Sequence, residues 1–296
     1  MAAVSEPLSH LWVIGPGRVG LSLGLALRQA GMVERLSYTG RNPTPPAHPL
    51  FQPALAAAYS AALDLPPGAP PALVAIAVPD DQIPAVARGL ADLALPADVP
   101  VLHTSGALGV EALAPLAASG VPVGSLHPLV AVSDTVGGAD LLRGAWYAVE
   151  GGSGAAAMAE RLVEGLGGRI LRIAPGGKAL YHAAAVFASN YLVALLSVAE
   201  RLLADAGAGG EDGREALAAL ATGAVRGAAG RGVVDALTGP VSRGDAETVE
   251  LHLARLSPSD ALLYSTLARE TLALARRQGL EPALAARIET VLNRKP

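Results

Sequence analysis

Four residues combine a side chain suited to proton transfer with a position at the edge of an apolar segment. His103 and His127 end two apolar runs, and Lys178 and His182 begin a long apolar segment with helical spacing. A histidine offers a donor, an acceptor and a titration near neutrality, while a lysine can protonate an atom that becomes anionic. His103 and His127 can equally be structural residues that bind backbone carbonyls, and the helical pair can belong to an ordinary helix N-terminus. The pattern makes all four candidates for catalysis.

Other polar residues near these four are candidates for substrate binding. On a helix, positions 178, 182 and 189 share a face, so Ser189 is expected on the same face as the lysine, and Asn190, a further catalytic candidate, lies toward the other edge, where it can orient a substrate. Arg243 can bind a carboxylate as a bidentate pair, although it can also cap a helix or bridge subunits. The histidines show no H-x-x-x-H or H-E-x-x-H spacing, so no metal site is predicted.

The segment LWVIGPGRVGLSLGLALRQAGM, residues 11–32, indicates what these side chains would work on. An apolar run, Leu11 to Ile14, precedes the G-x-G-x-x-G pattern of Gly15, Gly17 and Gly20, and helical spacing follows. In such a strand, turn and helix, the glycines allow a tight turn, close approach to a pyrophosphate and helix packing, and the helix N-terminus faces the phosphates. The pattern predicts dinucleotide binding; the alternative is a purely structural turn.

The second apolar run, Arg35 to Thr39, indicates which dinucleotide binds. NAD-binding units place an acidic residue at the end of this strand, but here no carboxylate occupies that position, and Arg41 offers a guanidinium that suits a 2′-phosphate. NADP is therefore predicted in preference to NAD, the alternative being a solvated arginine in a turn. The expected cofactor contacts are Gly15, Pro16, Gly17, Arg18, Val19, Gly20, Gly40, Arg41, Asn42, Val78, Pro79, Thr104 and Ser105.

The order of the patterned segments predicts an α/β protein with a Rossmann-type, doubly wound, mostly parallel sheet and an all-α C-terminal domain. We place the Rossmann domain at residues 1–174 and the helical domain at residues 175–296. A small alanine-rich helix is expected after the proline-rich loop at 42–53. Further strands are expected at 73–78, 99–103, 121–126, 146–150 and 169–173, and C-terminal helices at 178–206, 211–229, 245–256, 259–279 and 281–294.

Two carboxylates, Asp80 and Asp81, follow the strand expected at 73–78. We interpret them as helix caps ahead of Ile83 and Val86 in preference to catalytic groups. Together with the segments after residues 103 and 126, they would rim one crevice, because ligands of open α/β sheets bind outside the carboxyl ends of the strands.

Composition excludes several classes of protein. The 296 residues carry a net charge of -4 without a basic stretch, which argues against nucleic acid, and the lack of cysteine excludes disulfides and thiolate chemistry. The N-terminal MAAVSEPLSH has no basic region, so no signal peptide is expected and the cytoplasm is the default location. The apolar segment 183–199 contains polar residues, which favours a buried or subunit-facing helix over a membrane span.

Six stretches, in order GPGRVG, AVPDDQI, LHTSGALG, SLHPL, KALYHAAAVFASNY and LTGPVSRGD, resemble a bacterial family that joins a Rossmann-like NADP-binding domain to a helical domain of unknown function. The N-terminal half is similar to deazaflavin-type NADP oxidoreductases and pyrroline-5-carboxylate reductase. The whole chain resembles, more distantly, 6-phosphogluconate and 3-hydroxyisobutyrate dehydrogenases and ketopantoate reductase. SLHPL also resembles the HPM stretch of prephenate dehydrogenases.

The resemblance implies a fold, a cofactor class and one catalytic position. Hydroxyacid dehydrogenases use a Lys-x-x-x-Asn pair on the first helix after the Rossmann domain. Lys178 matches the lysine, whereas His182 stands in place of the asparagine and Asn190 comes two turns later.

Taken together, these features predict an NADP-dependent oxidoreductase that transfers hydride to or from a small carbonyl, hydroxyacid or imine substrate bound between the domains. The alternative is an NADP-binding sensor or scaffold without catalytic activity. The apolar circumference of segment 183–199 predicts a homodimer that forms through the helical domain.

Overall fold

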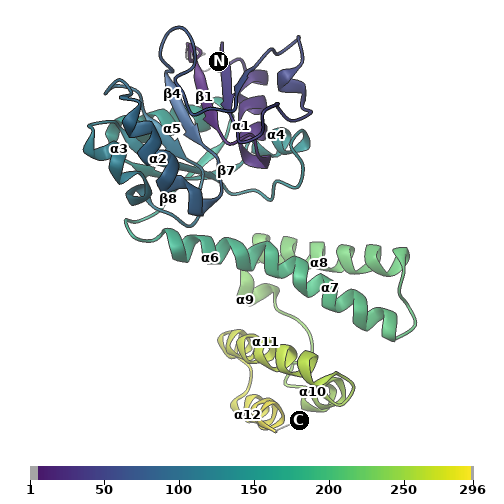
Figure 1. The fold of residues 1–296 in the computed structure, drawn as a ribbon. Helices are drawn as coiled ribbons and strands as arrows, with labels where there is room; N and C mark the ends of the chain where they lie inside the picture. The colour runs from purple at the N-terminus through teal and green to yellow at the C-terminus, as the bar shows by residue number, and fades with distance from the viewer. Residues whose placement is uncertain (1–5, 295–296) are drawn as a thin grey trace. The chain divides into compact units, whose positions relative to one another are not determined.

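The N-terminal part of the chain forms an eight-stranded sheet in the computed structural model, which describes residues 6–294 (Figure 1). The strand order is β3-β2-β1-β4-β5-β6-β7-β8, and only the β6–β7 pair is antiparallel among the pairs of this sheet. The predicted Rossmann-type, mostly parallel sheet is confirmed. Its strands are β1 (Leu11–Ile14), β2 (Leu36–Thr39), β3 (Ala58–Ser60), β4 (Leu73–Ile76), β5 (Val101–His103), β6 (Val123–Pro128), β7 (Trp146–Gly151) and β8 (Arg169–Arg172).

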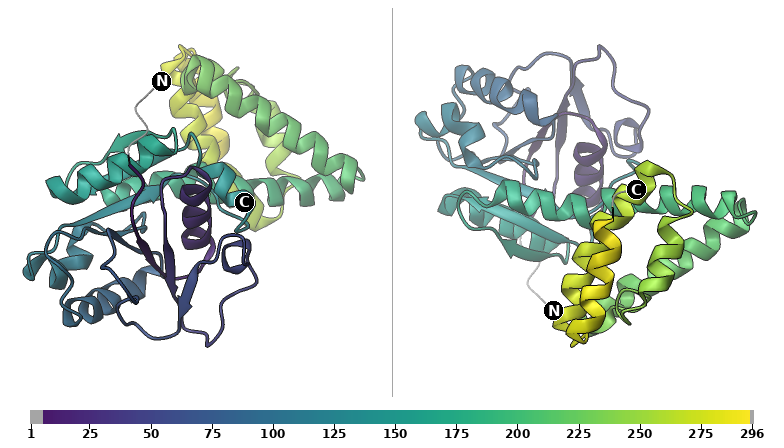
Figure 2. Two further views of the ribbon diagram at one scale, coloured as in Figure 1. Left: turned by 90° about the horizontal axis from the view of Figure 1, so that it is seen from above. Right: turned by 90° about the horizontal axis from the view of Figure 1, so that it is seen from below.

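Helices cover both faces of this sheet and bury an apolar core on each (Figures 1 and 2). Central strands such as β1 and β4 are buried along their whole length, which explains why they are continuous apolar runs. One face packs against α1 (Arg18–Gln29), α4 (Gly137–Leu142) and α5 (Ser153–Gly165). The other packs against α2 (Ile83–Asp92) and α3 (Ala114–Ala118). Short 3-10 helices are η1 (Pro49–Phe51), η2 (Asp80–Gln82) and η3 (Val110–Leu113).

The turn between β1 and α1 requires its glycines. Gly15 has φ +104°, a conformation that L side chains rarely adopt, and a Cβ atom at Gly20 would overlap the carbonyl oxygen of Gly15. The first glycine therefore makes the turn, and the third lets α1 pack closely on the sheet.

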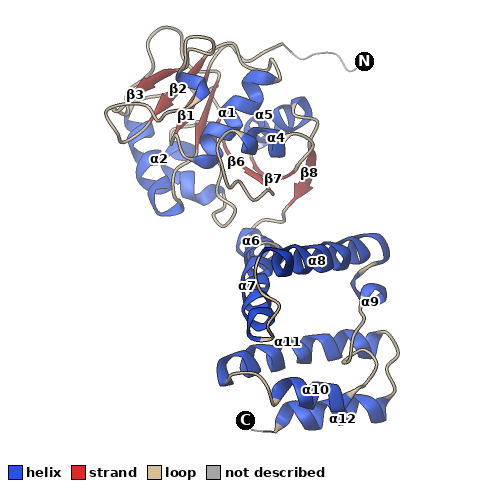
Figure 3. Cartoon of the chain, turned by 90° about the vertical axis from the view of Figure 1, so that its right-hand side faces the viewer, coloured by secondary structure: helices blue, strands red, loops and turns tan. Residues whose placement is uncertain are grey.

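The C-terminal part is helical (Figure 3). Val249, Leu272 and Ile288 lie in a small apolar core formed by α10, α11 and α12, and Arg201 of α7 binds Asp260 of α11 through two hydrogen bonds of 2.8 Å. The helices are α6 (Lys178–Ala188), α7 (Asn190–Asp205), α8 (Glu211–Arg231), α9 (Val233–Ala236), α10 (Ala246–Leu253), α11 (Pro258–Arg277) and α12 (Pro282–Asn293).

The chain divides into two compact units, residues 1–190 and residues 191–296. The change from strands to helices falls between Arg172 and Lys178, close to the boundary at 174 that the sequence predicts. Helix α6 nevertheless belongs to the first unit, because its N-terminal turn is hydrogen-bonded to the loop after β5 and to β6. Residues 1–5, part of the segment in which no signal peptide is expected, lie outside the described residues.

The prediction of an alanine-rich helix after the proline-rich loop is wrong. Residues Ala58–Ser60 instead form β3, which pairs in parallel with β2. Tyr59 explains the change: its ring meets Phe51 edge to face, and its hydroxyl donates to the carbonyl oxygen of Asn42 at 2.7 Å. These contacts and the pairing with β2 override the helix propensity of alanine.

The predicted capping by Asp80 and Asp81 is also wrong. Both lie in the short helix η2, whose N-cap is Pro79, and no side-chain capping bond forms there or at Gln82, the N-cap of α2. Both residues are exposed in the first turn of η2.

The segment Lys178–Asp205 is long and apolar enough, by length and composition, to cross a membrane, and none of its most apolar window is buried. Burial of this segment within the chain, one of the two arrangements that the sequence predicts, is therefore wrong for the described residues. The subunit-facing alternative stays open.

We predict that Gly24→Ala destabilises the first unit by about 1 to 3 kcal/mol, because a Cβ atom there would overlap the hydroxyl oxygen of the buried Tyr38. Urea unfolding followed by tryptophan fluorescence measures this, since both tryptophans, Trp12 and Trp146, lie in the first unit. Gly154→Ala is the control: its Cβ atom would lie 3.5 Å from Pro122, an ordinary contact, so this variant should unfold at the parent's midpoint or above it. Equal midpoints for the two variants would contradict the prediction.

Candidate functional site

A cavity of about 660 Å³ lies over the glycine-rich turn, at the carboxyl ends of β1, β2 and β4. Of the predicted cofactor contacts, eight line it: Gly15, Pro16, Gly17, Gly40, Arg41, Asn42, Val78 and Pro79. Gly17 is the N-cap of α1, and a Cβ atom there would meet only the carbonyl oxygen of Ala77, at 4.0 Å. The backbone at the N-terminus of α1 is therefore open to a ligand on the cavity side, as a pyrophosphate requires.

Arg41 gives this cavity its charge. It is exposed and lines the cavity beside Asn42 and Pro46, and none of the described lining residues carries a carboxylate. Thr39, the last residue of β2, is buried, and its hydroxyl accepts a hydrogen bond of 2.9 Å from the indole Nε1–H of Trp12. A neutral side chain therefore occupies the position where NAD-binding units place an acid. The electrostatics therefore suit an additional phosphate.

The other predicted cofactor contacts do not line the cavity. Gly20 is buried inside the packing of α1, and Arg18 and Val19 form the first turn of that helix. The Thr104 hydroxyl donates to the carbonyl oxygen of Ile76 at 3.4 Å, and the Ser105 hydroxyl accepts from the backbone N–H groups of Ala107 and Leu108. Both side chains shape the loop that follows β5.

His103 is a structural residue, the second of the two roles that the sequence allows for it. Its ring is fully buried, Nδ1 accepts from the backbone N–H of Ser105 at 3.2 Å, and Nε2 lies 3.0 Å from the carbonyl oxygen of Gly109. These partners require the neutral Nε2–H tautomer. Burial lowers the pKa of His103 to about 4, so the ring is uncharged at neutral pH. With both nitrogens occupied, His103 is withdrawn as a catalytic candidate.

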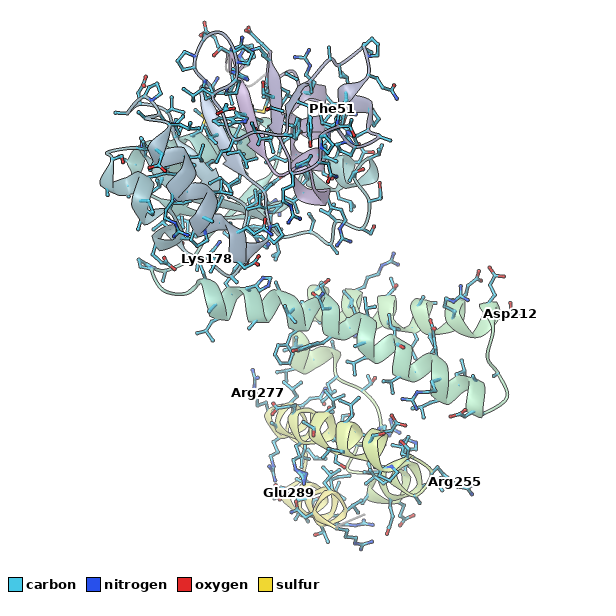
Figure 4. The ribbon with its side chains drawn as sticks, viewed as in Figure 1. Phe51, Lys178, Asp212, Arg255, Arg277 and Glu289 are labelled. Carbon is cyan, nitrogen blue, oxygen red and sulfur yellow. The ribbon has the colours of Figure 1, made fainter. Side chains whose placement is uncertain are left out.

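Lys178 is the first residue of α6 (Figure 4), and the residue is only 3% exposed. Nζ donates to the carbonyl oxygen of Ser105 at 2.9 Å and to the hydroxyl of Ser125 at 3.3 Å. Burial lowers the pKa of Lys178, and the more distant Glu150 opposes this shift. An ammonium has three donors, and neutral partners occupy two of them, so Lys178 retains one for a ligand.

His127 lies on β6 and faces the first turn of α6. Its Nδ1 is 2.7 Å from the hydroxyl of Tyr181, and its ring meets those of Tyr181 and His182 edge to face, with centroids 5.6 and 6.0 Å away. Burial is the largest cause that lowers the pKa of His127 to about 4, and the charge of Lys178 adds to it. The ring is thus a neutral hydrogen-bonding group at pH 7.

His182 completes this group of side chains around Gly106. Its Nδ1 is buried and has no hydrogen-bond partner among the described residues. A Cβ atom at Gly106 would lie 2.6 Å from this nitrogen and 2.8 Å from Nε2 of His127. The two imidazole nitrogens therefore point at one spot beside the backbone of Gly106. We call Lys178, Tyr181, His182 and His127 the α6–β6 cluster.

Sequence reasoning missed two members of this arrangement, Tyr181 and Gly106. Tyr181 was visible only as a residue beside the helical face of Lys178 and His182, one helical turn after the lysine. Gly106 follows His103 in the polar HTSG stretch, and no spacing rule indicates that two rings need its missing side chain.

The substrate-binding predictions are only partly compatible with the structure. Ser189 does not share a helical face with Lys178, because α6 ends at Ala188 and Ser189 has φ −121° and ψ −73°. Asn190 is the first residue of α7. Arg243 belongs to the second compact unit, in the turn before α10, and its side chain is exposed. The α6–β6 cluster is described within the first unit alone, and the roles of Asn190 and Arg243 stay predictions.

Similarity to solved structures covers most of the chain. A candidate NADP oxidoreductase from Bacteroides fragilis has a TM-score of 0.72 at 21% identity, covering 91% of this chain and 100% of that one. A protein from Thermotoga maritima has a TM-score of 0.67 at 22% identity, covering 90% and 99%. The pyrroline carboxylate reductase of Plasmodium falciparum, solved with NADP bound, has a TM-score of 0.58 at 14% identity, covering 97% and 98%. At these identities the likeness shows the fold.

No curated protein matches the chain. A Rossmann-like domain profile matches residues 2–128, and Domain of unknown function (DUF2520) matches residues 145–271. The chain therefore combines a Rossmann-like domain with a DUF2520 domain, the combination that its sequence resemblance implies.

Proposed function

We propose that this chain is a cytoplasmic NADP-dependent oxidoreductase that acts on a small carbonyl, hydroxyacid or imine substrate. The observation that carries the proposal is the cavity over Gly15 and Gly17, with Arg41 on its wall and no carboxylate among its described lining residues. The helix N-terminus suits a pyrophosphate and the guanidinium suits a 2′-phosphate. The fold shared with an NADP-bound reductase supports the same conclusion.

The position of the α6–β6 cluster supports the chemical half of the proposal. The cavity lies at the carboxyl ends of β1, β2 and β4, and the cluster lies at those of β5 and β6, the next strands in the sheet. In open α/β sheets a dinucleotide extends along this edge, so the cluster is where its reactive ring is expected. NADPH would supply the hydride.

The cluster can supply the proton that a reduction also needs. Lys178 keeps one free donor, and its lowered pKa brings the ammonium closer to the working range of a general acid. His182 lies one turn further along α6, with its unpartnered Nδ1 turned toward Gly106. In this proposal Lys178 is the proton donor, and His182 contacts the substrate.

We also infer that two copies of the chain associate through α7 and α8 of the second unit. Val193, Leu220 and Val225 are large aliphatic side chains on these two helices, and they are between 53% and 73% exposed. The most apolar window of Lys178–Asp205 has no buried residue and at most two charged ones. The same apolar helices of a second copy could pack against this surface and remove it from water.

The cofactor proposal predicts that NADPH binds about ten- to a hundredfold more tightly than NADH, and that Arg41→Ala removes most of this difference. A charge-assisted hydrogen bond of this kind is worth roughly 1.5 to 3 kcal/mol. Calorimetric titration with both nucleotides measures it. Arg88→Ala, which removes an exposed arginine of α2 that does not line the cavity, should bind both like the parent. Equal affinities of the parent for NADPH and NADH would refute the assignment.

The catalytic proposal predicts that Lys178→Met and His182→Ala each lower turnover by about a hundredfold or more, while NADPH affinity changes little. The assay follows NADPH oxidation with a panel of small 2-oxo acids, aldehydes and cyclic imines, and NADP reduction with the matching hydroxyacids. Asp81→Asn, at an exposed carboxylate of η2, should leave turnover unchanged. A parent that binds NADPH but turns over no compound of the panel would instead support the sensor or scaffold alternative.

The association proposal predicts a particle of about twice the 29.7 kDa chain mass in light scattering at micromolar concentration. Leu220→Glu should shift the particle toward the monomer, because it places a charge on the apolar surface. Leu65→Glu changes an exposed leucine of the first unit and should not. A monomeric parent, or one that instead floats with phosphatidylcholine vesicles, would show that a second copy does not cover these helices.

A further inference from the structure

Tyr181 and His127 form a hydrogen bond between α6 and β6. The tyrosine comes from the first turn of α6 and the histidine from β6, and their bond of 2.7 Å is shorter than the 3.3 Å bond of Lys178 to Ser125, which joins the same elements. The hydrogen bonds of Lys178 to Ser105 and Ser125 hold the same turn against the sheet. Both partners of the contact are therefore fixed by the surrounding structure.

Three other buried histidines show how this fold controls the tautomer of an imidazole. In each, Nδ1 accepts from a group that can only donate: Arg35 for His10, the backbone N–H of Leu50 for His48 and that of Ser105 for His103. Their Nε2–H groups face a serine hydroxyl or a backbone carbonyl. All three are thus Nε2–H tautomers.

For His127 the partner of Nδ1 is the hydroxyl of Tyr181, which can donate or accept a hydrogen bond. The direction in which the tyrosine O–H points therefore decides which tautomer His127 adopts. Burial raises the pKa of Tyr181 to about 12, and its ring also faces the ammonium of Lys178, whose Nζ is 5.7 Å from the centroid. His127 is the hydrogen-bond acceptor found for this hydroxyl within the described chain. A half-buried O–H that turned away from Nδ1 would be left without an acceptor within the described chain, which is unfavourable.

We propose that Tyr181 is a positioning residue that donates to Nδ1 of His127 and so holds this ring as the Nε2–H tautomer, with its donor directed at the spot beside Gly106. The inference rests on the proposed function and refines it. A fixed donor there favours a substrate group that accepts a hydrogen bond, such as a carbonyl oxygen or an imine nitrogen, over a protonated amine, which has no lone pair to accept one.

Nε2 of His127 and Nδ1 of His182 both lie close to Gly106, where a side chain would overlap them. The charged or titratable groups that act on His127 are Lys178, His182 and His103, and each of them opposes a positive charge on the ring. His127 therefore serves as a neutral donor, a role in which the choice of tautomer decides whether the ring can bind a carbonyl at all.

Nitrogen NMR of the full chain labelled with ¹⁵N-histidine tests the tautomer directly and needs no substrate. At pH 7 the parent should show His127 with a protonated Nε2 and an unprotonated, hydrogen-bonded Nδ1. Tyr181→Phe should convert this ring into a mixture of both tautomers. His127→Gln assigns the signal. If that variant does not fold, Gly106→Ala narrows the choice, because the added methyl group overlaps Nε2 of His127 and Nδ1 of His182 and so shifts both signals, and His182→Ala then identifies the His182 signal of the two.

The chain contains a matched control. His252 and Tyr264 form a second pair with Nδ1 3.0 Å from the hydroxyl and an interplanar angle of 85° in the exposed part of α10 and α11. Tyr264→Phe should alter the His252 signal and leave His127 unchanged.

A parent in which His127 is protonated at Nδ1, or a Tyr181→Phe variant that keeps the parent's tautomer, would overturn the inference. Titration of the same samples with NADPH separates this outcome from failure of the proposed function. If NADPH binds and the tautomer is wrong, only the inference fails. If NADPH does not bind and the tautomer is as expected, the positioning role of Tyr181 stands while the proposed function fails.

Discussion

The buried ammonium group of Lys178 joins the helix after the Rossmann sheet to the sheet itself. An unpaired charge in an apolar interior is costly, and here two neutral acceptors, the Ser105 carbonyl and the Ser125 hydroxyl, replace part of its hydration. Hydrogen bonds to charged groups contribute roughly 1.5 to 3 kcal/mol each. Because one acceptor follows β5 and the other lies on β6, satisfying this ammonium fixes the position of α6 relative to both strands.

This constraint determines the rest of the α6–β6 cluster. Residues three and four positions after Lys178 lie on the same side of the helix, so anchoring the lysine also brings Tyr181 and His182 to β6. There they meet His127, which points the same way as Ser125 because alternate residues of a strand share a face. One buried charge thus orders four side chains that come from two distant parts of the sequence.

Much of the fold was predictable from the sequence, and the errors have identifiable physical causes. The first strand and the helices after residue 210 have strong periodic patterns, and their predicted bounds lie within a few residues of the structure. The single helix expected at 178–206 is broken at Ser189 into α6 and α7. The strand at Ala58–Ser60 was missed because alanine favours helix locally, whereas the ring of Tyr59 and pairing with β2 decide the outcome. Asp80 and Asp81 had the composition of a helix cap, but the chain begins a 3-10 turn at Pro79, which has no capping side chain.

The cofactor half of the site was predictable to a greater extent than the catalytic half. The cofactor residues lie close together in the sequence, whereas the catalytic candidates depend on contacts between residues that are far apart in it. Gly15, Gly17 and Arg41 act within one strand, turn and helix, so their spacing carries the information. His103 and His127 look alike in sequence because both end apolar runs, yet a carbonyl six residues away satisfies the first and a tyrosine 54 residues away contacts the second. Only the fold shows which partner a histidine has. The ring that binds its own loop stabilises that loop, and the ring that binds a different element keeps its other nitrogen close to Gly106 and His182.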